Sequence, residues 1–137
     1  MNERVFLDTN VIVYADDKSA GEKRARALAL LGELVAGSRA VVSTQVLQEY
    51  FVVATRKLGV PPDVARRKVE ALSLLDVVII RPDLVLAAID LHRLHAISLW
   101  DALIVRCARA AGCARIFSDD LQDGQVFDGV RIENPFR

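Results

Sequence analysis

Short apolar segments alternate with longer segments of helical periodicity, and this alternation restricts the possible folds more than any other feature. Segments typical of strands lie at 5–7, 40–43, 76–80, 114–118 and, at the end, 130–133. Helical patterns occupy 11–15, 21–35, 44–58, 62–74, 82–95 and 98–111, and a loop is expected over 119–129. Strands separated by helices pair in parallel through crossovers. We therefore expect an α/β fold with three layers, α/β/α, around a central parallel sheet of four to five strands.

The size and composition favour one folded domain over residues 1–137. Hydrophobic residues make up 53% of the chain, enough for a buried core. No run of about 18 apolar residues could span a membrane. The first residues lack the apolar stretch of a signal peptide. We therefore expect a cytoplasmic protein without membrane contact, in which Cys107 and Cys113 are small core residues rather than a disulfide or zinc site.

Acidic residues stand where a parallel sheet places its ligands. Asp8 directly follows the first strand, and Asp119 and Asp120 follow the fourth. Glu49 lies on the helix that leaves the second strand, and Asp101 lies in the first turn of the last helix. Because strand ends and helix starts gather at one edge of such a sheet, these carboxylates can converge although they are distant in sequence.

Converging carboxylates repel one another unless a cation lies between them. Mg²⁺ and Mn²⁺ prefer oxygen ligands and can activate water for in-line attack on a phosphodiester. The pattern therefore favours hydrolysis of a phosphate ester, with either one metal ion or two.

Each acid alone also has a purely structural interpretation. Asp8 and Asp101 could cap helices, Glu49 could lie on an exposed helix face, and Asp119 and Asp120 could form a turn. The functional interpretation rests on their joint placement. By the same reasoning Thr9, Asn10 and Ser118 could cap and form turns, or their polar groups could orient a ligand carboxylate or a water.

Four sequence blocks carry these acids, namely VFLDTNV at 5–11, VSTQVLQE at 42–49, ISLWDALI at 97–104 and IFSDDLQDG at 116–124. In this order and spacing they resemble PIN-domain proteins, and most closely the VapC-like toxin ribonucleases of bacterial toxin–antitoxin pairs. The resemblance runs over nearly the whole chain.

The resemblance implies that Asp8, Glu49 and Asp101 are acids of a catalytic Mg²⁺ or Mn²⁺ site. The fourth block of the family reads Ser or Thr, any residue, then Asp, which makes Asp120 the matching acid. Asp119 occupies the variable position and is kept as a further metal ligand. The resemblance also implies an endoribonuclease with an RNA substrate, a homodimer and an antitoxin partner. A PIN fold that binds RNA or protein without cutting is the alternative.

Basic residues cluster on two neighbouring helical segments of this chain, whose net charge is zero. They are Arg56, Lys57, Arg66 and Arg67. They form either a solvated helix face or a rim that contacts the phosphates of RNA. The apolar helices over 22–36 and 44–74 belong to the core or offer a groove to a partner helix.

Other phosphate chemistries fit less well. The first strand ends in Asp8-Thr9-Asn10, without the second acid of haloacid-dehalogenase-like phosphatases, and no Gly-rich phosphate loop follows a strand. The later strand end lacks the lysine of a receiver domain. We expect His92 and His95 to be surface residues, which disfavours a histidine-based ribonuclease, and Trp100 to pack rather than to stack on a base.

Overall fold

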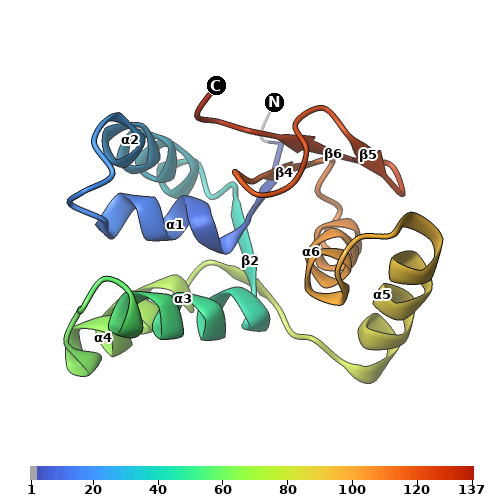
Figure 1. The fold of residues 1–137 in the computed structure, drawn as a ribbon, viewed down its shortest axis with the longest axis horizontal. Helices are drawn as coiled ribbons and strands as arrows, with labels where there is room; N and C mark the ends of the chain where they lie inside the picture. The colour runs from blue at the N-terminus through green and yellow to red at the C-terminus, as the bar shows by residue number, and fades with distance from the viewer. Residues whose placement is uncertain (1–2) are drawn as a thin grey trace.

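The computed structural model describes residues 3–137 and shows a six-stranded sheet with helices on both faces (Figure 1). The strands are β1 (Val5–Leu7), β2 (Ala40–Ser43), β3 (Asp76–Val78), β4 (Arg115–Phe117), β5 (Val126–Phe127) and β6 (Val130–Glu133). Their order across the sheet is β3-β2-β1-β4-β6-β5. All neighbours pair in parallel except β5 and β6, which are antiparallel. The expected three-layer α/β/α fold is confirmed, but the sheet has six strands instead of four to five and is mostly, not entirely, parallel.

The expectation of a loop over all of 119–129 is wrong, because β5 lies within it. Asp128 and Gly129 connect β5 to β6 with φ values of 54° and 81°. Positive φ at both central residues is what two-residue hairpin turns require, and Asp-Gly is a strong sequence signal for them. The dipeptide therefore predicts the antiparallel hairpin that the periodicity does not show.

Six helices connect and cover the strands. They are α1 (Thr9–Asp16), α2 (Glu22–Ala36), α3 (Thr44–Arg56), α4 (Pro62–Leu72), α5 (Pro82–His95) and α6 (Leu99–Ala110). The expected helices all form, with ends that differ by one or two residues. Ser43 and Ser98 cap α3 and α6, since their hydroxyls accept hydrogen bonds from the backbone N–H groups of Val46 and Asp101.

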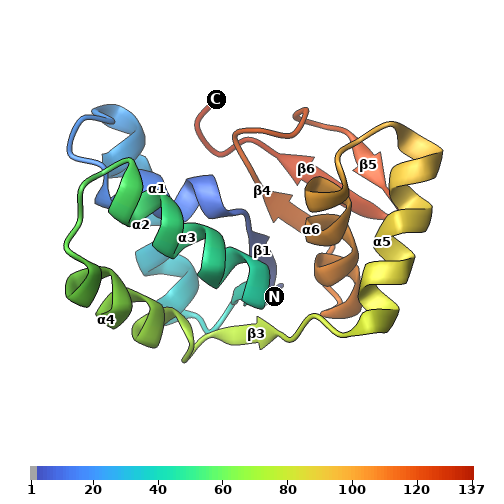
Figure 2. The ribbon, with the colours of Figure 1, turned by 60° about the horizontal axis from the view of Figure 1, so that its bottom comes forward.

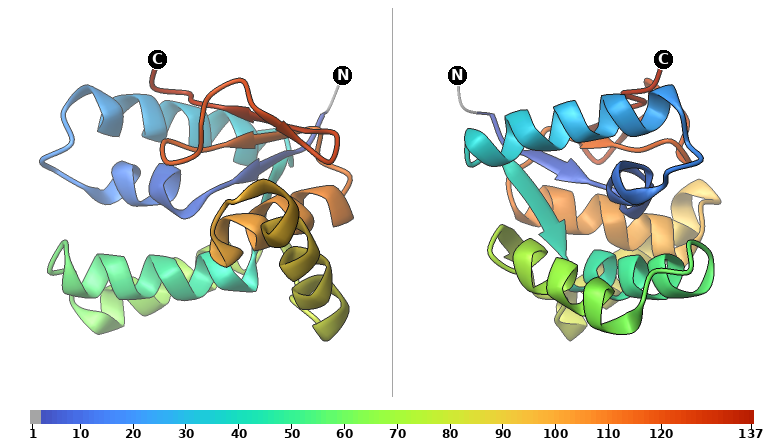
Figure 3. Two further views of the ribbon diagram at one scale, coloured as in Figure 1. Left: turned by 45° about the vertical axis from the view of Figure 1, so that its right-hand side comes forward. Right: turned by 90° about the vertical axis from the view of Figure 1, so that its left-hand side faces the viewer.

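The helices form two groups around the sheet. Helix α2 covers one face and α6 the opposite face (Figure 3). Helix α5 packs against α6, whereas α3 packs against both α1 and α4. In Figure 2, α1 to α4 lie on one side of β4 and β6, and α5 and α6 lie on the other. The carboxyl ends of β1 and β4 point toward the space where these two groups meet.

The core lies on both sides of β1, whose three residues are fully buried. A central strand covered on both faces is continuously apolar, as VFL is here. Cys107 and Cys113 are buried and free, so their expected role as core residues is confirmed. Within residues 3–137, no helix is both long and apolar enough to cross a membrane.

Candidate active site at the carboxyl edge of the sheet

Asp8 is the residue at which β1 becomes α1. Its backbone N–H donates to the carbonyl of Phe117, which continues the pairing of β1 with β4 by one residue. Its carboxylate caps α1 by accepting from the N–H of Thr9 at 2.8 Å. The hydroxyl of Ser118 donates to the other carboxylate oxygen at 2.7 Å. Asp8 therefore caps a helix and also faces the site, so the two interpretations of this residue are compatible.

Burial raises the pKa of Asp8 from 3.8 to about 6, and the negative charges of Asp120 and Glu49 add to the rise. The hydrogen bonds from Ser118 and Thr9 oppose it. A carboxyl group that is buried, and that faces two other acids, is difficult to ionise without a nearby cation. The pKa of Asp8 therefore reflects a carboxyl group that is withdrawn from water and lies close to two other acids.

Glu49 reaches the same place from α3. The hydroxyl of Thr9 donates to Glu49 Oε1 at 2.9 Å, and Gln45 Nε2 lies 3.4 Å from the same oxygen. Gln45 is buried and also donates to the backbone carbonyl of Trp100 at 3.2 Å. Gln45 therefore connects α3 with the start of α6. The sequence analysis overlooked it, although a polar residue one helical turn before Glu49 is a usable signal.

Asp101 and Asp120 complete the acidic group. Asp101 lies in the first turn of α6, half-buried, and burial together with the charge of Asp120 raises its pKa, although the hydrogen bond with Ser98 lowers it. Asp120 follows β4 and is exposed, and its backbone N–H donates to the hydroxyl of Ser118 at 3.2 Å. Ser118 therefore holds Asp8 through its donor and positions the backbone of Asp120 through its acceptor.

One cleft of about 580 Å³ contains these four acids, as the joint placement predicted. Its lining also includes Thr9, Asn10, Val13, Tyr14, Asp17, Gln45, Gln48, Val52, Val53, Lys57, Leu58, Trp100 and Ile104. Among residues 3–137, no lysine, arginine or histidine forms an ion pair with Asp8, Glu49, Asp101 or Asp120.

The donor set of this cleft suits Mg²⁺ or Mn²⁺, because it consists of carboxylate oxygens without a competing basic partner. The negative charges of Asp120 and Glu49 contribute to the raised pKa of Asp8, although burial is the larger cause. In the part of the chain that the structure describes, no three His, Cys, Asp or Glu side chains are close enough to hold an ion as they stand. Binding would therefore require the acidic side chains to move closer together.

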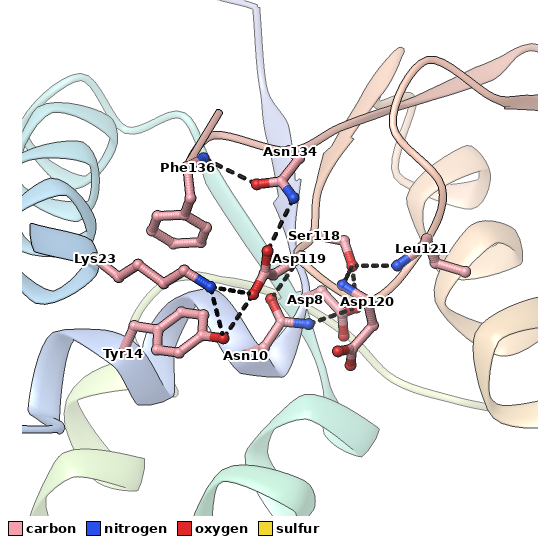
Figure 4. A network of polar contacts seen from close by, with 10 residues as sticks. All are labelled: Asp8, Asn10, Tyr14, Lys23, Ser118, Asp119, Asp120, Leu121, Asn134 and Phe136. Carbon is pink, nitrogen blue, oxygen red and sulfur yellow. Dashed lines mark hydrogen bonds and ion pairs between the residues drawn. The ribbon is translucent and has the colours of Figure 1, made fainter. Parts of the chain in front are cut away.

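Asp119 points away from the cleft, into a separate network (Figure 4). It accepts hydrogen bonds from Tyr14 at 2.6 Å, from Lys23 at 3.0 Å and from Asn134 at 2.9 Å. Burial alone would raise the pKa of Asp119, but these three donors outweigh burial and lower it. The structure thus separates the two adjacent acids: it places Asp120 on the cleft and Asp119 in contacts that hold α1, α2 and the C-terminal segment together.

Asn10 bridges the cleft and this network. Its amide nitrogen lies 3.4 Å from Asp8 Oδ2, and its amide oxygen accepts from the backbone N–H of Asp119 at 3.0 Å. Each of Thr9, Asn10 and Ser118 therefore forms a direct contact with the carboxylate of Asp8. The sequence analysis overlooked Tyr14, which lies one helical turn beyond Asn10 on α1 and contacts both Asp119 and Lys23.

Of the four basic candidates, only Lys57 lines the cleft. Arg56 is exposed at the end of α3. Arg66 and Arg67 lie on α4 and form ion pairs one turn away with Glu70 and Asp63. The pairs partly neutralise the cluster, so α4 offers little free charge to a phosphate backbone.

His92 and His95 lie near the end of α5, away from the cleft. His92 Nδ1 contacts the carbonyl of Ile97, and the ring of His95 packs edge-on against Phe127. Both are exposed, as expected. Trp100 does not pack into the core, so that expectation is wrong: 61% of the residue is exposed, and it forms part of the cleft wall.

The fold and the cleft define a three-layer α/β domain with an acidic site at the carboxyl edge of a mostly parallel sheet. The family model described as PIN domain matches residues 5–124. The chain belongs to the PIN domain family. A comparison with curated proteins gave no match.

Several solved structures share the fold at low sequence identity. A toxin–antitoxin complex from Klebsiella pneumoniae is 20% identical, with a TM-score of 0.72 over 96% of this chain and 97% of that chain. The sarcin–ricin loop cleaving toxin VapC20 of Mycobacterium tuberculosis is 21% identical, with a TM-score of 0.67 over 85% and 91%. VapBC from Salmonella typhimurium, bound to DNA, is 21% identical, with a TM-score of 0.68 over 97% and 98%.

Proposed function

We propose that this PIN domain is a metal-dependent endoribonuclease that hydrolyses phosphodiester bonds of RNA. One observation carries the proposal: Asp8, Glu49, Asp101 and Asp120 line one cleft and have no ion-pair partner within residues 3–137. Such a cleft favours binding of a divalent cation. Without that cation, its negative charge disfavours binding of an anion such as phosphate. Mg²⁺ or Mn²⁺ is the proposed cofactor.

The four carboxylates would hold the cation, and each is already positioned by a neighbour. Thr9 orients Glu49, Ser118 orients Asp8, and the capped start of α6 presents Asp101. A divalent cation, when bound, supplies Lewis acidity that lowers the pKa of a water and offsets the charge of the phosphate. The chain contributes the geometry, and Asp120 is the most exposed of the four acids.

We further propose that the protein is the toxin of a toxin–antitoxin pair and that it forms a homodimer. The proposal is supported by the sequence blocks that resemble VapC-like toxins and by the fold shared with toxins solved in antitoxin complexes. The antitoxin would be a protein that blocks the acidic cleft or its approaches.

A cleavage assay tests the nuclease proposal directly. The purified protein, freed of any copurified partner, is incubated with total cellular RNA in Mg²⁺, in Mn²⁺ and in EDTA. We expect cleavage only with metal, and none from the Asp8→Asn/Asp101→Asn double variant. Asp90→Asn is the matched control, because Asp90 is an exposed acid on α5 outside the cleft.

The alternative is a PIN fold that binds RNA or protein without cutting. Titration calorimetry with Mn²⁺ separates the two. A nuclease should bind Mn²⁺ in a manner that Asp8→Asn abolishes, whereas a binding module should bind RNA and remain inactive in every metal. The second result would overturn the proposal.

A further inference from the structure

Trp100 occupies an unusual position for a large aromatic side chain. It is the second residue of α6, directly before Asp101, and 61% of it is exposed on the wall of the acidic cleft. Burying an indole ring normally contributes strongly to stability. An exposed indole inside a cleft is therefore better explained by a ligand than by the fold.

The backbone at Trp100 is held in place although its ring is free. Its carbonyl accepts a hydrogen bond from Gln45 Nε2, whose other contact is the carboxylate of Glu49. Ser98 caps the same turn through the N–H of Asp101. The backbone of Trp100 is thus held by residues that also contact Glu49 and Asp101.

The cleft wall also carries aliphatic side chains. Val52, Val53 and Leu58 from α3 and the residues after it line the cleft together with Ile104 from α6. Val52 is 46% exposed, in keeping with an open apolar surface. One cleft therefore combines an acidic part with an apolar part that includes an aromatic ring. A nucleotide has the same two parts, a charged phosphate and a flat apolar base.

We propose that Trp100 and Val52 form a nucleobase subsite, in which the indole stacks on a base next to the scissile phosphate. This inference rests on the proposed nuclease function. It assigns to Trp100 a contact that would position the RNA substrate. Every base has a π-face, so stacking favours unpaired RNA without reading its sequence. Substrate must enter this cleft to reach the acids, which favours a nucleobase over a protein side chain as the occupant.

The protein has a single tryptophan, so its intrinsic fluorescence reports on Trp100 alone. The experiment uses the parent protein, whose acidic cleft is intact, and records the fluorescence in a stopped-flow instrument before cleavage proceeds. The protein is titrated in Mg²⁺ with a short single-stranded RNA of random sequence, and with an abasic ribose-phosphate chain of the same length. We expect saturable quenching by the RNA and none by the abasic chain.

Fluorescence anisotropy of labelled RNA gives the matching affinities. We expect Trp100→Ala to weaken binding by about tenfold, within the range for loss of one base–aromatic stack, and Trp100→Phe to recover most of it. Leu94→Ala is the control, because Leu94 is 76% exposed but lies on α5 outside the cleft. It should bind RNA as the parent does.

Three outcomes would overturn the inference. If RNA binds without quenching the fluorescence, and binds Trp100→Ala as tightly as the parent protein, the subsite does not exist. The proposed nuclease function would be unaffected by that result. Quenching by a copurified protein but not by RNA would assign Trp100 to a protein interface. Absence of both RNA binding and metal-dependent cleavage would remove the proposed function together with the subsite.

Discussion

Thr9 donates its hydroxyl to Glu49 at 2.9 Å, and its backbone N–H donates to Asp8 at 2.8 Å. One small residue thus holds two acids that come from different elements, the end of β1 and the middle of α3. Thr9 therefore links the Asp8 and Glu49 carboxylates.

Thr9→Val keeps the shape of the side chain and removes the hydroxyl. We expect metal affinity and RNA cleavage to fall by about 10- to 100-fold, because partners of metal-binding carboxylates contribute effects of this size. Calorimetric titration with Mn²⁺ measures the affinity. Thr9→Ser, which keeps the hydroxyl, should retain most of both. Equal affinity in Thr9→Val and the parent protein would show that Glu49 needs no such orientation.

The raised pKa of Asp8 makes the metal-free protein sensitive to pH. A carboxyl group with a pKa of about 6 when folded and 3.8 when unfolded holds its proton more tightly in the folded state. Its stabilising effect is complete below about pH 4 and is lost as pH rises through 6. At pH 7 the loss corresponds to about 3 kcal/mol at most.

Asp8→Asn removes this titration and should therefore stabilise the metal-free protein at pH 7. The free energy of unfolding is measured with urea in EDTA between pH 4 and pH 7. The difference between variant and parent should grow in favour of the variant as the pH rises. A difference that does not change with pH would mean that Asp8 is ionised without cost. Saturating Mn²⁺ should reverse the order, because only the parent gains from binding.

The adjacent acids Asp119 and Asp120 should respond differently to the same substitution. Asp120→Asn removes a carboxylate from the cleft, and we expect metal-dependent cleavage to fall by at least about 100-fold. Asp119→Asn should cut RNA within a few-fold of the parent protein and instead lose about 1–2 kcal/mol of stability, since it weakens three hydrogen bonds. Inactive Asp119→Asn with unchanged stability would assign Asp119 to the metal site.

Lys57 is the basic candidate that can reach RNA in the cleft. Lys57→Gln should weaken RNA binding and lower the slope of log affinity against log salt by about one. Arg66→Gln and Arg67→Gln should change the slope less, because both arginines already pair on α4. Binding is compared over a salt series at early times after mixing, before cleavage proceeds. Equal slopes for all variants would make the whole cluster a solvated face.

The thiols of the two cysteines should be unreactive in the folded protein. Burial raises the pKa of Cys107 to about 11 and that of Cys113 to about 11, so few thiolates form near neutral pH. Ellman's reagent at pH 8 should react with neither until urea unfolds the chain. Rapid reaction of one thiol in the native state would reveal an opening of the α6–β4 region.

The sequence predicted the architecture for two reasons. Hydrophobic periodicity identifies each helix and strand from its own residues. The rules for crossover connections then leave only a few ways to arrange those elements. It missed β5, since two residues carry no periodicity, although Asp128-Gly129 signals a hairpin. Parallel strands bring their carboxyl ends together, which is why the sequence predicted that the four acids converge at one edge of the sheet.

The direction of single side chains was less predictable. Asp119 and Asp120 are neighbours with the same chemistry, and only the partners that fold around β4 distinguish them. Trp100 was expected to pack, because most tryptophans do. Its exposure follows from its place in the first turn of α6 above the cleft, which depends on how α3 and α6 are arranged and not on the local pattern.

Ser118 and Asp8 meet across 110 positions of sequence, at the centre of the sheet. A contact of such long range closes a large loop of the chain, and closing it costs entropy. No partly folded intermediate that lacks the β1–β4 pairing can therefore present Asp8 and Asp120 together. Any activity of this centre belongs to the completed fold alone, and refolding followed by recovery of cleavage would report the final cooperative step.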